Sequence, residues 1–130
     1  MSCYVQEVEL DNVQLVLPVI QRIFPRAQIK IELGDVFFVA LYNGKIIGFL
    51  HINERENFIL LKGIGIDERY RNAGNGSMLL EKLDEIARTT EKKVLLKVKC
   101  TNPVVLLYER YGFVLKKFGP VYTLVKKMNN

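Results

Sequence analysis

The fold of this chain is decided by the stretch Arg71-Asn72-Ala73-Gly74-Asn75-Gly76. It lies between an apolar, strand-like run over 58–66 and an amphipathic, helix-like run over 77–88. The first N–H groups of a helix have no intrahelical partner, and the helix dipole adds partial positive charge there. Because glycine has no Cβ atom, Gly74 and Gly76 let a phosphate approach these N–H groups, and Arg71 adds a cation. The stretch therefore predicts a pyrophosphate cradle and a nucleotide-containing cofactor.

Two better-known phosphate-binding loops do not fit this stretch. A Walker loop needs lysine and then serine or threonine after its last glycine, whereas Ser77 follows Gly76 directly. The dinucleotide-binding fingerprint nearly begins at Gly63 and Gly65, but Glu68 stands at its third glycine position. Taken alone, the six residues also fit an ordinary surface turn with an exposed arginine.

Length and composition predict one globular domain over residues 1–130. The chain is 49% hydrophobic, which excludes a disordered protein, and no apolar run approaches the ~20 residues of a membrane helix. The first seven residues lack the basic and apolar regions of a signal peptide. With only Cys3, Cys100 and His51 as soft ligands, we expect neither disulfides nor a bound metal. A cytoplasmic protein that is a monomer or homodimer is expected.

The chain is basic, with 19 Lys and Arg against 14 Asp and Glu and a net charge of +5. Lysine pairs at 116–117 and 126–127 contribute part of this charge. Such a balance fits a partner that carries phosphates, either a nucleic acid or a phosphorylated cofactor. The chain has no helix-turn-helix, zinc-finger or RNP motif, so we do not expect nucleic acid as its specific partner. Most of the lysines are explained by a solvated surface.

The N-terminal third is predicted as a strand followed by one or two helices. Residues 4–10 alternate as a first strand does. A helix capped by Asp11 or Asn12 follows, and Pro18 either kinks this helix or delays its start. One face of the helix would carry Val13, Leu17, Ile20 and Phe24. The segment 26–34 is ambiguous and could form a short second helix.

The middle of the chain predicts three antiparallel strands. Asn43-Gly44 joins apolar runs at 36–42 and 45–53, and this dipeptide is the strongest short hairpin signal. A turn at 54–57 leads into a third strand over 58–66. Gly63 and Gly65 in that strand indicate a bulge or a close backbone approach.

The C-terminal half alternates helices and strands. We expect a helix from about Gly76, a strand over 93–100, a short helix that begins at Asn102-Pro103 and ends before Gly112, and final strands at 113–117 and 121–127. The predicted fold is an α/β domain with a mixed, mostly antiparallel sheet. Its central parallel strand pair is connected by the helix after Gly74, and helices flank the sheet.

These ordered features resemble the GNAT superfamily of acyl-CoA-dependent N-acyltransferases. The resemblance covers the strand before the loop, the R-x-x-G-x-G loop at 71–76, the following helix and strand, and the run Leu107-Tyr108-Glu109-Arg110-Tyr111-Gly112-Phe113. It extends over roughly the C-terminal half of the chain. The loop and the Tyr-x-x-x-Gly-Phe ending support the assignment together more strongly than either does alone.

The resemblance implies roles for individual residues. Coenzyme A pyrophosphate would be held by the backbone of Arg71, Asn72, Ala73, Gly74, Asn75, Gly76 and Ser77. The pantetheine arm would pair with Ile64, Gly65 and Ile66. Asn102 would lie near the cofactor and Tyr108 near the thioester sulfur, although strict family spacing puts Thr101 at the asparagine position.

Acetyl transfer to an amine needs a neutral amine, donors for the oxyanion and a proton source for the leaving thiolate. The phenol of Tyr108 has a reference pKa of ~10, near that of an alkyl thiol, so it could act as the acid. Many relatives carry an acidic base on the strand before the loop, but Lys62 is the only ionisable residue in 58–66. His51 could replace it, as could a water chain or an acid of the turn, Glu54 or Glu56. Tyr108 and His51 also fit purely structural roles.

Lys97 and Lys99 alternate with apolar residues and therefore share one strand face. If that face lines the acceptor cleft, an anionic acceptor is favoured; otherwise the face is simply solvated. The leading hypothesis is an acetyl-CoA-dependent N-acetyltransferase, in which a primary amine attacks the thioester of acetyl-CoA directly. A catalytically silent acyl-CoA-binding module and a basic nucleic-acid-binding protein are the alternatives. Protein N-termini, lysines, polyamines, amino sugars and drugs are all open as acceptors.

Overall fold

A computed structural model describes residues 3–71, 74–102 and 104–127. The strands are β1 (Cys3–Val8), β2 (Asp35–Tyr42), β3 (Lys45–Glu54), β4 (Phe58–Ile66), β5 (Lys93–Lys99), β6 (Val114–Lys117) and β7 (Val121–Lys126). The α-helices are α1 (Leu17–Ile23), α2 (Asn75–Thr90) and α3 (Val104–Arg110), and the 3₁₀ helices are η1 (Leu10–Leu15) and η2 (Glu68–Tyr70). Within the described ranges, no helix is both long and apolar enough to cross a membrane.

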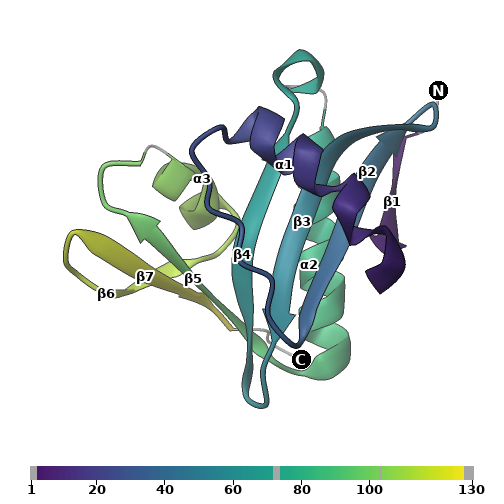
Figure 1. Cartoon of the computed structure of the whole chain (residues 1–130). Coiled ribbons are helices and arrows are strands. Elements are labelled where there is room, and N and C mark those ends of the chain that lie inside the picture. Colours follow the sequence, from purple (N-terminus) through teal and green to yellow (C-terminus); the bar gives the residue numbers. More distant parts are fainter. Residues whose placement is uncertain (1–2, 72–73, 103, 128–130) are drawn as a thin grey trace.

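The seven strands form one sheet in the order β1-β2-β3-β4-β5-β7-β6. All neighbouring strands are antiparallel except β4 and β5, which are parallel and are connected through α2. In Figure 1, α1 crosses one face of the sheet and α2 lies behind the other. The predicted mixed sheet with a central parallel pair is therefore confirmed.

Local sequence signals place most of these elements. Asn43 and Gly44 adopt positive φ angles of 49° and 81°, as a two-residue hairpin turn requires. Gly112, two residues beyond the end of α3, has a φ of 93°, and the N–H of Phe113 donates to the carbonyl of Tyr108 at 3.1 Å. This bond closes the last helical turn and fixes where Tyr108 stands.

The first helix differs from its prediction. Residues 10–15 form the 3₁₀ helix η1, so Asp11 and Asn12 lie inside that turn and do not cap α1. The α-helix begins late, at Leu17, because Pro18 fits the first turn, where its missing N–H costs no hydrogen bond. Phe24 lies just beyond the helix and packs edge-on against Phe49, with ring centroids 6.0 Å apart. The ambiguous segment 26–34 forms no helix.

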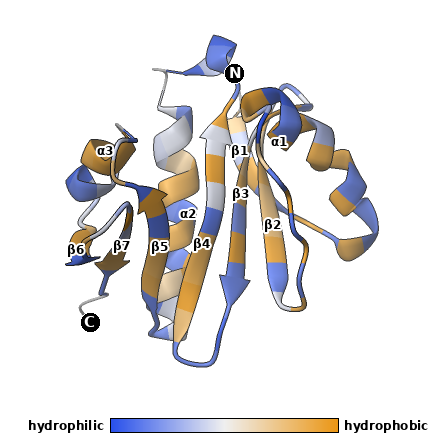
Figure 2. Cartoon of the chain, turned by 60° about the vertical axis from the view of Figure 1, so that its left-hand side comes forward, coloured by the Kyte–Doolittle hydropathy of each residue, from blue (hydrophilic) through white to orange (hydrophobic). Residues whose placement is uncertain are grey.

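Two hydrophobic clusters hold the helices to the sheet. The larger packs α2 against the strands and includes Leu79, Leu83, Val94 and Leu96. The smaller packs η1 and α1 against the opposite face, through Val16, Ile20, Phe37 and Phe49 among others. In Figure 2 the central strands are largely coloured as hydrophobic, whereas the turn between β3 and β4 is hydrophilic. One face of the central sheet is thus covered by α2, and the other by η1 and α1.

Candidate functional site

Strands β4 and β5 pair over only part of their length. Their parallel register runs from Phe58 opposite Lys93 to Leu61 opposite Leu96. Beyond Leu61, β4 pairs only with β3, and β5 continues only with β7. The edges of the two strands that face each other are open there, and Figure 1 shows β5 turning away from β4. This open edge includes Ile64, Gly65 and Ile66, the residues predicted to pair with pantetheine.

A β-bulge accompanies the separation of the strands. His51 lies opposite Gly63 but Ile52 lies opposite Leu61, so Lys62 is the extra residue of β4. A bulge bends its strand and increases its twist. The predicted irregularity near Gly63 is therefore confirmed. Gly65 serves a close approach instead, since a Cβ atom there would lie 2.9 Å from the ring of Phe24.

A cavity of about 940 Å³ opens where the strands part. Its walls come from the end of α1 and the segment after it, from β3, β4 and β5, and from the start of α3. The lining includes both predicted catalytic residues, Tyr108 and His51, and also Ile64 and Asn102. Residues far apart in the sequence are therefore brought together around one space.

His51 lies on β3 and is buried, with a relative exposure of 5%. Its ring stacks on Phe37, with centroids 4.0 Å apart. Nε2 lies 3.0 Å from Oδ2 of Asp35, although the two atoms are not aligned as a hydrogen bond. Burial lowers the pKa of His51 below its usual value, and the Asp35 carboxylate, which raises it, offsets only part of this effect. The imidazole is therefore neutral at neutral pH.

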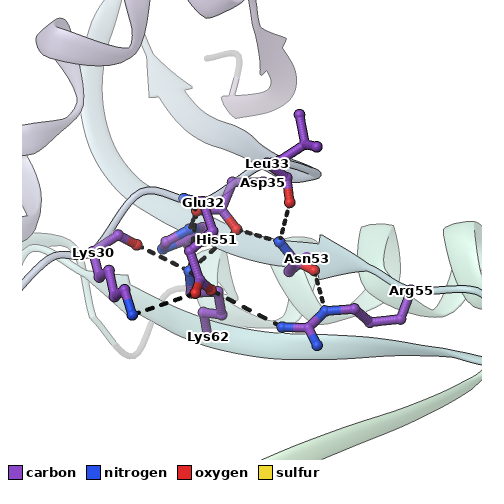
Figure 3. Close-up of polar contacts among 8 residues, drawn as sticks. All are labelled: Lys30, Glu32, Leu33, Asp35, His51, Asn53, Arg55 and Lys62. Carbon is purple, nitrogen blue, oxygen red and sulfur yellow. Dashed lines mark hydrogen bonds and ion pairs between the residues drawn. The ribbon is translucent and has the colours of Figure 1, made fainter.

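Asp35 is the centre of a buried polar cluster, drawn in Figure 3. Its carboxylate accepts hydrogen bonds from Nδ2 of Asn53 at 2.7 Å, from the N–H of Glu32 at 2.8 Å and from Nζ of Lys62 at 3.0 Å. Burial alone would raise the pKa of Asp35, but the contacts with Asn53, Glu32, His51 and Lys62 outweigh it and lower the pKa to about 2. Asp35 is thus a fixed negative charge beside His51.

Sequence reasoning missed Asp35. The hairpin turn alone would pair Tyr42 with Lys45 and, counted onward, Val36 with His51. The actual register shifts by one between Ala40 and Leu41, so His51 lies opposite Phe37. Asp35, two residues before Phe37, then shares a face with His51. Asp35 could have been found as an acid two residues away from the residue that pairs with His51 on the neighbouring strand. That search works only when the register shift between Ala40 and Leu41 is already known.

The other acids considered as bases are not near the cavity. Glu54 ends β3 and forms an ion pair with Nζ of Lys92 at 2.7 Å. Glu56 is exposed in the following turn. Neither residue lines the cavity.

Tyr108 lies on α3 and is 8% exposed. Its ring meets that of Phe113 edge-on, with centroids 5.6 Å apart. Burial raises the pKa of Tyr108 to about 12. The phenol therefore keeps its proton throughout the neutral range, at the wall of the cavity.

The N-terminus of α2 has the features of an anion site. Gly74 precedes it with a φ of 81°, no side chain caps the helix, and its first turn contains no acid. A Cβ atom added at Gly74 would meet nothing within 4 Å, and one at Gly76 would meet only Ile66, at 3.9 Å. The predicted residues Asn72 and Ala73 lie outside the described residues.

Neighbouring side chains fix the path of the backbone into α2. Nε of Arg71 donates to the carbonyl of Ile66 at 2.9 Å, and Nδ2 of Asn75 donates to the carbonyl of Tyr70 at 2.8 Å. The hydroxyl of Ser77 is hydrogen-bonded to that of Tyr111, which ties α2 to the end of α3. Arg71 and Asn75 thus shape the loop through their side chains, and the helix N–H groups stay free of side-chain caps.

Asn102 caps α3, since its Oδ1 accepts the N–H of Val104 at 3.0 Å. The cap predicted from Asn102-Pro103 is confirmed, although Pro103 itself lies outside the described residues. Asn102 lines the cavity, whereas Thr101 does not. Lys97 and Lys99 also line it, so their shared strand face borders the site.

Comparison with known proteins agrees with this architecture. A family model described as an acetyltransferase (GNAT) domain matches residues 34–115. No curated protein matches the chain. Among solved structures, PaiA N-acetyltransferase from Thermoplasma acidophilum, in complex with coenzyme A, has a TM-score of 0.82 and 18% identity over 98% of this chain and 100% of its own.

Two further structures share the fold over nearly their whole length. The ribosomal-protein-S18-alanine N-acetyltransferase from Escherichia coli has a TM-score of 0.81 and 18% identity, over 99% of this chain and 97% of its own. Naa50 from Arabidopsis thaliana, in complex with the bisubstrate analogue CoA-Ac-MVNAL, has a TM-score of 0.82 and 17% identity, over 98% and 100%. Because the family model spans most of the chain and the divided sheet has the same architecture, the chain belongs to the GNAT acetyltransferase family.

Proposed function

We propose that this protein is an acetyl-CoA-dependent N-acetyltransferase whose acceptor is a primary amine. The observation that carries the proposal is the separation of β4 from β5, which opens a cavity lined by both His51 and Tyr108. A neutral base and a protonated acid, on different elements, thus border one space. Membership of the GNAT family supports the same reaction class.

The residues present fit a bound coenzyme A. The uncapped N-terminus of α2 offers free N–H groups to the pyrophosphate, and the absence of an acid from its first turn avoids repulsion. The unpaired edge of β4 at Ile64, Gly65 and Ile66 can hydrogen-bond an extended amide-containing arm. When bound, acetyl-CoA supplies a thioester carbonyl that a neutral amine can attack.

His51 is assigned the role of general base, directly or through one water molecule. The negative charge of Asp35 beside Nε2 favours the tautomer with hydrogen on that nitrogen, which leaves Nδ1 to accept a proton from the amine. Because burial keeps the imidazole neutral, His51 is ready to accept this proton at neutral pH. Asp35 is a positioning residue that acts through His51.

Tyr108 is assigned the role of general acid. With its pKa raised to about 12, the phenol is fully protonated at pH 7 and can donate its proton as negative charge develops on the leaving sulfur. Packing against Phe113 and the closed helix end hold the ring in place. The unpaired N–H groups of the β4 edge are available to the developing oxyanion.

Gly76→Asp should weaken coenzyme A binding more than Gly76→Asn does, by about tenfold or more at low ionic strength. The two side chains have nearly the same shape, so the difference reports a negative charge placed beside the pyrophosphate. The backbone tolerates both, since a Cβ atom at Gly76 would meet only Ile66, at an ordinary contact distance of 3.9 Å. An acid in the first helical turn should even raise the melting temperature slightly. Calorimetry with coenzyme A measures the difference. Equal affinities of the two variants would contradict binding of the pyrophosphate at this site.

Tyr108→Phe should lower kcat by about 10²-fold while the KM for acetyl-CoA changes little. The substitution keeps the ring and its contact with Phe113 but removes the proton. Steady-state release of coenzyme A with a saturating amine measures both constants. A kcat within about twofold of wild type, in a protein of unchanged melting temperature, would assign Tyr108 to packing only.

A further inference from the structure

We propose that the acceptor is a primary amine that carries carboxylates close to its amino group, recognised by basic side chains that line the cavity. This inference rests on the proposed function and names the substrate class of the same site. The chemistry is that of an acidic amino acid or of a peptide with an acidic N-terminus. Amines with several positive charges, such as polyamines or lysine-rich peptides, are disfavoured.

The charges on the cavity wall all have one sign. Five basic side chains belong to the lining: Arg26, Lys30, Lys62, Lys97 and Lys99. The described lining residues include no aspartate or glutamate. A cleft lined by charge of one sign focuses the field and concentrates ligands of the opposite sign.

Lys97 and Lys99 supply the clearest uncompensated charge. They alternate along β5 with Leu96 and Val98, which are buried against the α2 face. Lys97 and Lys99 therefore project on the opposite face, the one covered by α1. Both are exposed, and no described residue forms an ion pair with either.

The opposite wall is also basic. Arg26 is exposed on the segment after α1, and no described residue pairs with it. Lys30 lies 3.6 Å from Glu32, but its side chain is 81% exposed, so solvent weakens that pair. Lys62 differs from these residues because Asp35 and Glu32 neutralise it. The cavity thus has free cations on two sides, from β5 and from the segment that follows α1.

This arrangement suits both binding and chemistry. Carboxylates gain favourable interactions with the cations, whereas each additional ammonium group would be repelled. The same positive field disfavours protonation of the reacting amine and lowers its pKa. Because the neutral amine is the nucleophile, the basic wall helps to prepare the acceptor for attack as well as to select it.

The two lysines of β5 are distinct from the phosphate site. The N-terminus of α2 belongs to the helix that covers the other face of the sheet, whereas Lys97 and Lys99 face α1. Substitution of these lysines should therefore change the response to the acceptor and leave coenzyme A affinity unchanged.

The test measures acetylation of matched acceptors by the full chain. One series uses peptides with the same first residue, in which the second and third residues are both aspartate, both asparagine or both lysine. A second series compares free aspartate with asparagine and with spermidine, so the two series separate peptide acceptors from small amines. We expect kcat/KM to be about tenfold or more higher for the aspartate members, and we expect added salt to reduce this ratio.

The double variant Lys97→Glu, Lys99→Glu should reverse the preference, so that lysine peptides or spermidine become better acceptors than the aspartate compounds. Lys93→Glu is the matched control, because Lys93 lies on the same face of β5 but outside the cavity lining. It should retain the wild-type preference. Coenzyme A affinity, measured by calorimetry, should be the same in all three proteins.

The possible failures are distinguishable. Turnover of neutral or cationic acceptors as fast as anionic ones would overturn this inference and leave the proposed function standing. Loss of coenzyme A affinity in the double variant would also overturn it, because the lysines would then serve the cofactor. Coenzyme A binding without turnover of any acceptor would overturn the proposed function and the inference together.

Discussion

His51→Gln should lower kcat by about 10³-fold, the middle of the range for general acid–base catalysis. Glutamine keeps a polar group near the position of Nε2, beside Asp35, but cannot accept a proton at neutral pH. His51 lines the cavity and its Nε2 lies 3.0 Å from Asp35, so the substitution removes the proposed base from the cavity wall and leaves a polar group beside Asp35. The KM for acetyl-CoA should change by less than about threefold, because His51 does not belong to the proposed phosphate or pantetheine sites.

The pH profile distinguishes a base from a packing residue. In the wild type, kcat should fall as the pH is lowered through the pKa of His51, because the protonated ring cannot accept the amine proton. Burial places this pKa below the ordinary value of 6.5, so the fall should occur on the acidic side of 6.5. His51→Gln should lack this limb and keep only the ionisation of the acceptor, which is common to both proteins.

The control for His51→Gln is a measurement of folding and of cofactor affinity. The stacking contact with Phe37 will be lost, so some loss of stability is expected. A variant with the wild-type kcat and the same acidic limb would assign the base to another group. A variant that loses coenzyme A affinity to the same extent as kcat would mean that His51 supports the fold of the site instead.

Asp35→Asn should lower the free energy of unfolding by about 3–5 kcal/mol, as expected when one partner of a buried ion pair is removed. The carboxylate of Asp35 is 2% exposed and accepts from Lys62, whose side chain is 16% exposed. Asparagine would leave the partly buried ammonium of Lys62 without its nearest opposite charge. Its amide nitrogen would also face the Nδ2 donor of Asn53 or the Glu32 N–H. Urea unfolding measures the difference.

The Asp35 variant also has a pH signature. Asp35 has a folded pKa of about 2 against its ordinary value of 3.8, so its stabilising contribution is complete above pH 3.8. That contribution is lost as the pH falls from about 4 to about 2, and it amounts to about 2 kcal/mol. Asp35→Asn should therefore lack this part of the acid destabilisation seen in the wild type.

A matched control for Asp35→Asn is Asp84→Asn. Asp84 also accepts from a lysine, Lys126 at 2.8 Å, but its side chain is 22% exposed. Water can replace part of that interaction, so the expected loss is about 1 kcal/mol or less. In the double variant Asp35→Asn, Lys62→Met, stability should partly return because the ammonium that loses its contact with Asp35 is gone, along with its weaker contact with Glu32 at 3.2 Å. Equal effects of Asp35→Asn and Asp84→Asn would contradict the central role of Asp35.

Local signals in the sequence were sufficient for most of the fold. Asn43-Gly44 supports positive φ angles that few other residues adopt, so the hairpin could be placed from two residues. Gly74 and Gly112 mark the start of α2 and the end of α3 for the same reason. Together with the apolar run of β4 and the resemblance to a known family, these elements determined the mixed sheet. They also indicated the proposed anion site at the N-terminus of α2.

The N-terminal helix shows where local signals are insufficient. Its apolar spacing was correct for Val13 and Ile20, which are buried, but the pattern did not distinguish the 3₁₀ turn of η1 from the α-helix that begins at Leu17. Both helix types bring residues three or four apart onto one face. Packing of η1 and α1 on the sheet, and the position of Pro18, decide the boundary.

The chemistry of the site depended on tertiary structure. His51, Tyr108, Lys97 and Lys99 could each be named from the sequence, but their common cavity exists only because β4 leaves β5 after Leu61. The partner of His51 depended on a single-residue shift in the pairing of β2 with β3. Side chains alternate between faces along a strand, so a shift of one residue exchanges the face that each presents to its neighbour. The sequence by itself determined the hairpin that carries His51; the register that places Asp35 beside it is set only when the strands pair in the folded sheet.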